Sequence, residues 1–234
     1  VPLYTSDSRA WRIDQLTNVL DSLESTGKPT VIFVHGRGKE PNKSLRGGTF
    51  TDGMAVHKIE LGYDVRVLML NWDSAFKGFH FLDREVPLSH TEAASVALGQ
   101  VLKELQKHQS AAPLSPKPAL LVHSMGSIVI QKAILAGTWP DASGLFSCVL
   151  FSQPDADDVG HSVWLERLAQ REKVFVTLNK DDHVLKRSTD ARPKGTHALG
   201  LGAMDPLAVS ATYVDLTCMG PMGQKDEDHE VFGK

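Results

Sequence analysis

The chain has 234 residues, of which 41% are hydrophobic and 23% charged, values that argue against a disordered, collagen-like or coiled-coil protein. It carries 25 basic and 28 acidic side chains, a net charge of −3, so it lacks the basic excess typical of nucleic-acid binders. Two cysteines exclude a disulfide framework.

The sequence contains no apolar run of the roughly 18 residues that a membrane helix needs. The first residues, VPLYTSD, lack the basic region and apolar core of a signal peptide. The chain also begins without Met, so a trimmed start and a removed leader both stay open, and the compartment stays open with them.

Two hydrophobic periods alternate along the chain, a pattern typical of α/β proteins. Helices are expected at 10–24, near 52–61, at about 90–108 and at about 125–137. Short apolar runs predict six strands, at 30–34, 65–70, 119–122, 148–151, 174–178 and 211–216. Because crossovers between parallel strands are right-handed, these elements predict a mostly parallel sheet with helices on both faces. We expect a single domain spanning residues 1–234.

The third predicted strand turns directly into a helix at a serine, within the sequence VHSMG at 122–126. Such a turn is typical of a nucleophile elbow, which exposes the serine Oγ at the carboxyl edge of the sheet. Gly126 fits the usual pattern of small neighbours, but Val122 does not. Either the adjacent strand is recessed there or the turn is looser, and a helix N-cap serine is the structural alternative. We predict that Ser124 is a catalytic nucleophile.

Backbone N–H groups near this turn are candidates for an oxyanion hole. The N–H of Met125, directly after the nucleophile, would supply one donor. The second is expected from the sequence HGRG at 35–38, whose glycines let the backbone come close to a substrate. Arg37 is the preferred donor and Gly36 the next. We expect His35 to be buried and to brace this loop rather than act as a base.

A catalytic serine needs a histidine base, and the base needs an orienting carboxylate. In this kind of turn the partners follow in the order Ser, Asp or Glu, His. Asp182 follows the fifth predicted strand, and the apolar Val184 and Leu185 come directly after it. Asp182 is therefore the expected acid, with Asp181 and Asp155 as alternatives.

The base is expected after the last predicted strand, where His229 is the one histidine. It lies near the end of the chain, where chains tend to fray, and Val231 and Phe232 would hold it in place. His197 is the alternative base. A histidine in an acidic tail is the structural alternative for His229.

Asp157, Asp158 and His161 form a further acidic cluster in one short loop. They have no matching set of imidazole or thiolate ligands elsewhere in the sequence, so we expect no metal there. Acyl transfer by a serine needs no cofactor, and none is expected.

With these motifs in hand, the chain resembles the α/β-hydrolase superfamily over residues 30–232. Within it, the chain is most similar to a bacterial family without an assigned function. The His-Gly loop at 35–36, the elbow at 122–126, Asp182 and His229 follow the superfamily's order. Lesser motifs of that family match NWDS at 71–74 and Pro154-Asp155. The resemblance implies an eight-stranded sheet or a reduced version of it. Because six strands are predicted, we expect the two N-terminal antiparallel strands to be absent.

Larger hydrolases of this type insert a helical cap between the fourth and fifth predicted strands, but residues 152–172 have room for about one helix. We therefore expect no cap domain and an open site. The predicted function is that of a carboxylesterase-like serine hydrolase that acts on a small-molecule ester through an acyl-enzyme. Two alternatives remain: a hydrolase-fold binding or scaffold protein without turnover, and an acyltransferase or peptidase with the same triad. The oligomeric state stays open.

Overall fold

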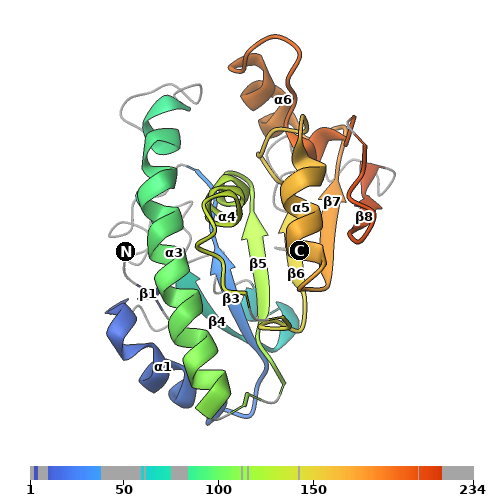
Figure 1. Cartoon of the computed structure of the whole chain (residues 1–234). Coiled ribbons are helices and arrows are strands. Elements are labelled where there is room, and N and C mark those ends of the chain that lie inside the picture. Colours follow the sequence, from blue (N-terminus) through green and yellow to red (C-terminus); the bar gives the residue numbers. More distant parts are fainter. Residues whose placement is uncertain are drawn as a thin grey trace.

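A computed structural model describes residues 3–4, 10–37, 59–60, 62–74, 84–111, 113–114, 116–141, 143–204 and 206–217. Eight strands in these residues form one sheet, in the order β2-β1-β4-β3-β5-β6-β7-β8. The six strands from β3 to β8 are parallel to one another, and β1 and β2 pair antiparallel at one edge (Figure 1).

The strands are β1 (Leu3–Tyr4), β2 (Ala10–Trp11), β3 (Thr30–Val34), β4 (Arg66–Leu70), β5 (Ala119–His123), β6 (Val149–Ser152), β7 (Val174–Leu178) and β8 (Thr212–Asp215). All six predicted strands are confirmed. The central ones are short apolar runs because neighbouring strands and both faces of the sheet enclose them.

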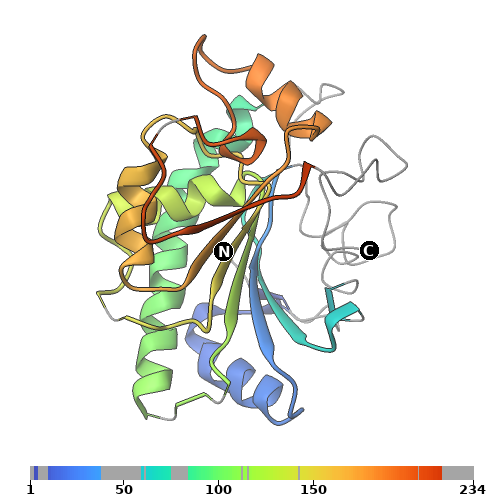
Figure 2. The same ribbon diagram turned by 90° about the vertical axis from the view of Figure 1, so that its right-hand side faces the viewer.

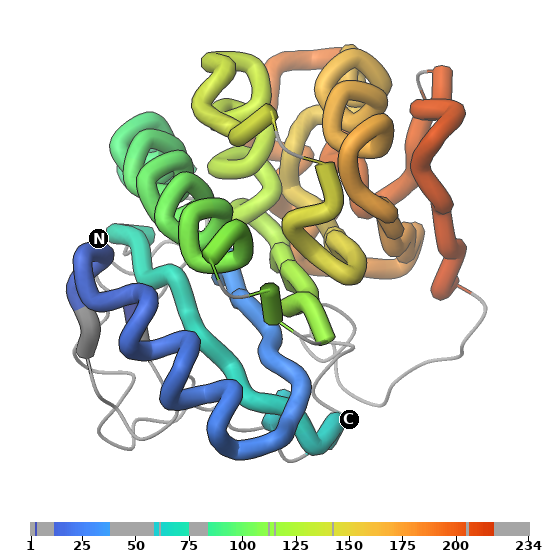
Figure 3. Tube along the Cα trace, turned by 60° about the horizontal axis from the view of Figure 1, so that its bottom comes forward, coloured from blue at the N-terminus to red at the C-terminus, as the bar shows by residue number. Residues whose placement is uncertain are grey.

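The α-helices are α1 (Leu16–Glu24), α3 (Glu85–Ala111), α4 (Gly126–Leu135), α5 (His161–Ala169) and α6 (His183–Asp190). Two short 3-10 helices are η1 (Ile13–Gln15) and η2 (Leu199–Leu201). Helix α3 begins earlier than predicted because Pro87 lies in its first turn, where a missing N–H costs no helical hydrogen bond. Seen from one end of the sheet, α3, α4 and α5 lie in a row over it (Figure 3).

Alternate strand positions face the two sides of the sheet. Val34 and Val122 belong to the larger core cluster, together with residues of α1, α3, α4 and α5. Phe33 and Leu121 face the other way and pack with Ile59, which belongs to a short helical stretch at 59–60 and 62–63. Helical residues thus cover both faces, as predicted (Figure 2). The rest of the helix predicted near 52–61 lies outside the described residues.

Two predictions for the N-terminal part are wrong. The antiparallel strands expected to be absent are present, since Leu3 pairs with Trp11 on one side and with Leu70 on the other. Residues 10–11 are strand β2 rather than the start of a helix, and the helical turns begin at Ile13. Strands of two residues are too short for a periodic pattern, and they form because the edge of β4 offers unpaired backbone groups.

The connection from β6 to β7 is described in full and contains one helix, α5. Trp164, Leu165 and Leu168 of α5 are buried in the larger core cluster. This helix packs on the sheet and forms no cap, as predicted. None of the described helices combines the length and the apolar character needed to cross a membrane.

Candidate active site

Ser124 occupies the turn between β5 and α4, at the carboxyl edge of the parallel strands. Its φ of 51° lies in the left-handed region, which costs free energy for a residue other than glycine. The Ser124 N–H donates to the Ser152 carbonyl at 3.1 Å, and the Ser124 carbonyl accepts from the Asp155 N–H at 3.0 Å. The turn therefore has the strained, fixed backbone that is typical of a nucleophile elbow.

Ser127, at the start of α4, restrains the same turn through its buried side chain. Its Oγ donates to the Ser124 carbonyl at 2.7 Å and accepts from the Ala156 N–H at 2.8 Å. Ser127 was not among the site residues predicted from the sequence. A serine three positions after the nucleophile was the available signal, because short hydroxyl side chains bond to nearby backbone groups.

Two glycines allow neighbouring backbone segments to approach the turn closely. A Cβ on Gly126 would lie 2.7 Å from Val34 O, and a Cβ on Gly36 would lie 2.8 Å from Ser124 Cβ. Val122, in contrast, is fully buried in the larger core cluster. The turn reaches its left-handed conformation with valine at this position, so the departure from the usual small residue does not prevent it.

The residues predicted for an oxyanion hole lie at or beside this turn. Met125 is the N-cap of α4, and its N–H donates to no group among the described residues. Gly36 is buried against Ser124, and Arg37, next in the chain, is half-buried. Their roles as donors to a substrate oxygen stay predictions.

His35 is fully buried and braces the loop after β3, as predicted. Its Nδ1 lies 2.8 Å from Gly36 O, and its Nε2 lies 3.0 Å from Asn71 Oδ1. The indole N–H of Trp72 donates to the His35 carbonyl at 2.8 Å, and the two rings stack. These contacts join the ends of β3 and β4 and fix the position of Gly36.

The two aspartates after β7 differ in their surroundings. Asp182 is fully buried and caps α6, with Oδ1 accepting from the Leu185 N–H at 2.9 Å. Leu185 is also fully buried, so the chain re-enters the core directly after Asp182, as predicted. The Asp181 side chain is 67% exposed and lies 3.5 Å from Lys186 Nζ. Asp182 therefore offers the buried carboxylate that an orienting acid requires.

Asp155, the other alternative acid, lies in a network of buried side chains. Its Oδ1 accepts from Ser188 Oγ at 2.6 Å and from Arg192 at 2.7 Å, and its Oδ2 lies 3.7 Å from Arg84 Nε. Burial lowers the pKa of Arg192, the nearby charge of Asp155 opposes this shift, and that of Arg84 adds to it. The Asp155 carboxylate thus already interacts with two guanidinium groups and a hydroxyl.

Backbone hydrogen bonds tie the loops after β5, β6 and β7 together. The Gly200 N–H donates to Pro154 O at 2.8 Å, and the Asn179 N–H donates to Gly200 O at 2.7 Å. The Asp182 N–H then donates to Asn179 O at 3.2 Å. Pro154 directly precedes Asp155, whose N–H donates to the Ser124 carbonyl. Ser124 and Asp182 are therefore connected through one continuous set of bonds at the same edge of the sheet.

The predicted base, His229, lies outside the described residues. The alternative base, His197, is exposed in the loop before η2. Its N–H donates to Asp158 Oδ1 at 3.0 Å, and its carbonyl accepts from the Asp158 N–H at 3.0 Å. These bonds fix its backbone to the loop after β6. The identity of the base stays a prediction.

The acidic cluster after β6 is divided among different partners. Asp157 pairs with Arg192, whereas Asp158 accepts the backbone bond from the loop before η2. The Nε2 atom of His161 lies 3.0 Å from the hydroxyl of Tyr213. These three side chains therefore make separate structural contacts.

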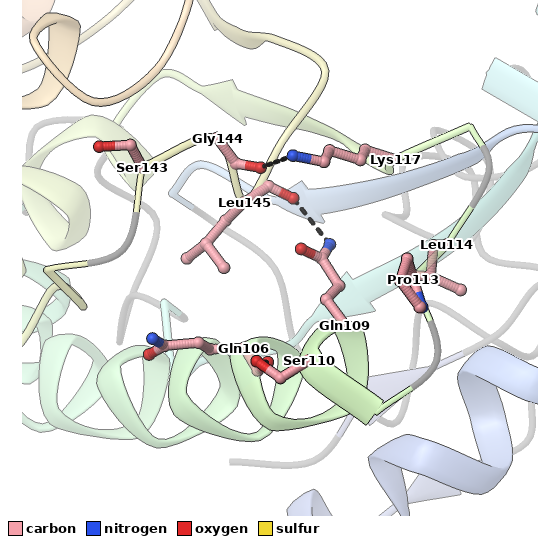
Figure 4. A pocket seen from close by; sticks show the side chains of 9 residues that line it. All are labelled: Gln106, Gln109, Ser110, Pro113, Leu114, Lys117, Ser143, Gly144 and Leu145. Atoms are coloured by element: carbon pink, nitrogen blue, oxygen red, sulfur yellow. Dashed lines mark hydrogen bonds between the residues drawn. The ribbon is translucent and has the colours of Figure 1, made fainter.

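A pocket of about 280 Å³ lies at the opposite end of the sheet (Figure 4). It is lined by the end of α3 and by the loops that lead into β5 and β6, and Lys117 and Gln109 hydrogen-bond the backbone of Gly144 and Leu145. Ligands of open α/β sheets bind outside the carboxyl ends of the strands, where Ser124 lies. This pocket is therefore separate from the candidate active site.

The fold and the turn at Ser124 agree with the family to which the sequence belongs. A family model described as an alpha/beta hydrolase of unknown function (DUF900) matches residues 12–214, so the chain is a member of that α/β-hydrolase family. No curated protein matches the chain.

Several solved structures are similar to the chain at low sequence identity. A cold-adapted esterase from an Arctic intertidal metagenomic library is 14% identical, with a TM-score of 0.43, over 80% of this chain and 72% of that one. A lipase/esterase from Lactobacillus plantarum is 12% identical, with a TM-score of 0.40, over 82% and 77%. An esterase/lipase from an uncultured bacterium is 12% identical, with a TM-score of 0.40, over 88% and 75%.

Proposed function

We propose that this protein is a serine hydrolase that cleaves small or accessible carboxylic esters through an acyl-enzyme. The observation that carries the proposal is the left-handed conformation of Ser124 between a strand and a helix. Local strain of this kind persists only where the surrounding structure holds it, and it is concentrated at functional sites. Membership of an α/β-hydrolase family supports the same function.

In the proposed reaction, Ser124 Oγ attacks the ester carbonyl while His229 takes its proton. His229 then gives the proton to the departing alcohol, and Asp182 orients the imidazole and stabilises its charged form. Water, deprotonated by the same histidine, attacks the acyl-enzyme and releases the carboxylic acid and free Ser124. The N–H groups of Met125 and Arg37, with Gly36 as the alternative, would hold the negative oxygen.

The choice of acid follows from the contacts of the three candidates. Asp155 already neutralises buried arginines, and Asp181 is exposed to water, which weakens its interaction with an imidazole. Asp182 is buried at the N-cap of α6, after β7, and is joined to the nucleophile turn by backbone bonds. Since no cap lies between β6 and β7, we expect the site to accept short or protruding acyl groups.

The test is hydrolysis of p-nitrophenyl acetate, butyrate and octanoate, together with labelling by a fluorophosphonate probe. Loss of a catalytic nucleophile lowers turnover by about 10³-fold or more, so S124A should lose both activity and labelling. The matched control is S89A, an exposed serine on α3, which should keep both. Equal, slow rates in wild type and S124A with no labelling would instead favour a binding protein without turnover.

Two pairs of variants test the remaining roles. D182N should lose activity and D181N should keep it, while H229Q should lose activity and H197Q should keep it. The opposite result in either pair would reassign that role. Adding an alcohol acceptor to the assay separates hydrolysis from acyl transfer, since an acyltransferase would convert the acyl group mainly into the new ester.

A further inference from the structure

Helices α1 and α3 bring three potential metal ligands together away from the candidate active site. Asp21 and Glu24 are three residues apart on α1, so they share one face of that helix. His108 lies in the last turn of α3. One ligand atom from each of the three residues lies within 4.8 Å of the others.

His108 is the unusual member of this cluster. Its side chain is 3% exposed, and its Nε2 makes no hydrogen bond. This atom lies 3.7 Å from Asp21 Oδ1, which is too long for a hydrogen bond. A buried polar atom without a partner costs free energy, and here it points toward two carboxylates.

The helix ends make the same place electrostatically negative. Asp21 and Glu24 both lie in the last turn of α1, which contains no basic residue. The carboxyl end of a helix carries a partial negative charge and favours cations, so two carboxylates there need compensation. The nearby Lys107 pairs with Glu104 at 2.5 Å on its own helix. The described surroundings therefore favour a bound cation at the cluster.

We propose that Asp21, Glu24 and His108 bind one divalent transition-metal ion, with Zn²⁺ as the best fit. One imidazole nitrogen and two carboxylate oxygens are ligands that Zn²⁺ accepts, whereas Mg²⁺ and Ca²⁺ prefer oxygen alone. In a Zn²⁺ site with bonds of about 2.0–2.2 Å, the ligand atoms lie closer to one another than the 4.8 Å that bounds their separation here. Rotation of the two exposed carboxylate side chains would bring the ligand atoms to the shorter separation. The remaining coordination positions face solvent and take water.

The ion would join α1 to α3 and does not depend on the proposed esterase activity. Arg84, just before α3, contacts Asp155 beside the nucleophile turn, whereas His108 lies near the other end of this 27-residue helix. At 1.5 Å per residue, the stretch from Arg84 to His108 spans roughly 35 Å. A metal at the cluster therefore acts on the contact between two helices.

The direct test is titration of chelator-treated protein with ZnCl₂, followed by calorimetry and by NMR of the histidine imidazoles. In wild type, the His108 resonances should shift as one equivalent binds. H108Q and D21N/E24Q should each weaken this binding at least tenfold, and Zn²⁺ should raise the melting temperature of wild type but not of these variants. The control is H90Q. His90 also lies on α3 but pairs with Asp73, away from the cluster, so this variant should bind Zn²⁺ as wild type does.

Two outcomes would overturn the proposal. If wild type and H108Q bind Zn²⁺ equally and the wild-type His108 resonances do not move, zinc binds elsewhere on the chain. If these resonances respond to pH but not to Zn²⁺, Co²⁺ or Mn²⁺, the cluster is an ion pair between helices. Circular dichroism of H108Q and D21N/E24Q verifies that a loss of binding does not arise from unfolding.

Discussion

The backbone of Ser124 is held from three directions in a conformation that a serine seldom adopts. Its N–H donates a hydrogen bond to β6, and its carbonyl accepts one from the loop after β6. The side chain of Ser127, on α4, donates to the same carbonyl. The surrounding structure supplies the free energy that keeps the residue at a φ of 51°. Strain of this kind has a measurable effect on stability, separate from any effect on catalysis.

We predict that S124G is more stable than S124A by about 1 kcal/mol, although neither should hydrolyse esters. Glycine adopts the left-handed conformation without strain, and its extra freedom in the unfolded chain offsets part of the gain. Chemical denaturation at neutral pH measures the difference. At Ser89, in the helical interior of α3, the order should reverse, with S89A the more stable by about 1 kcal/mol. If S124A were instead the more stable of the two, as expected at Ser89, position 124 would be unstrained.

Local sequence predicted the turn better than it predicted the contacts around it. The elbow could be recognised because a strand, a serine and a glycine follow one another within five residues. The partners of Asp155 could not be recognised, because Arg84 and Arg192 are far from it in the chain and belong to no motif. That contact depends on how the loop before α3 and the end of α6 converge on the sheet.

At the scale of elements, the long apolar runs were predictable and the two-residue strands were not. Strands β3 to β7 each carry enough consecutive apolar residues to indicate burial, and β8 is a mostly exposed edge strand. Strands β1 and β2 depend on the edge of β4 for their existence. Some loops are also held by single side chains. Glu172, just before β7, accepts the Leu145 N–H at 2.9 Å and the Phe146 N–H at 3.2 Å.

The pKa of Glu172 makes this anchor dependent on pH. Burial raises the pKa above 4.5, and the bonds from Leu145 and Phe146 partly oppose the rise. A raised pKa in the folded state gives a stabilising contribution that is fully present below about 4.5 and is lost as pH rises through the folded value. A variant with an amide in place of the Glu172 carboxyl should therefore gain stability relative to wild type as pH rises.

We predict that the free energy of unfolding of E172Q, minus that of wild type, increases from pH 4 to pH 7. Urea unfolding of both proteins at each pH gives this difference, and the other carboxylates cancel in it. At every pH E172Q loses one acceptor for the Leu145 and Phe146 N–H groups, which lowers its stability by an amount that does not depend on pH. The test is therefore how the difference in free energy of unfolding changes with pH, and not its absolute size. The prediction would be contradicted if wild type became more stable relative to E172Q as the pH rises.

At the scale of the whole molecule, one buried ion-pair network connects parts of the chain that are distant in sequence. Asp155 binds Arg84 at the entrance to α3 and Arg192 just after α6, and all three side chains are more than nine-tenths buried. The network lies directly behind the nucleophile turn, since the Asp155 N–H bonds the Ser124 carbonyl. Its loss would affect the fold as a whole.

We predict that D155N lowers the free energy of unfolding by about 3–5 kcal/mol, because it removes the carboxylate that two buried guanidinium groups share, although Arg192 keeps its pair with Asp157. Denaturation with guanidinium chloride at pH 7 measures the loss. The comparison is D181N, at the exposed ion pair with Lys186, where a change below about 1 kcal/mol is expected. Similar values for D155N and D181N would mean that the network contributes little to stability.

The strand order also determines how the sheet can form while the chain is being synthesised. β5 joins the free edge of β3, and β6, β7 and β8 each join the edge of the strand made just before them, so none of these strands has to enter between two that are already paired. β1 is the exception, because Leu3 pairs with Leu70 of β4. At typical rates of synthesis, Leu3 is made on the order of 3–15 s before its partner strand. During that interval these residues must stay out of pairings with other strands that would block β4.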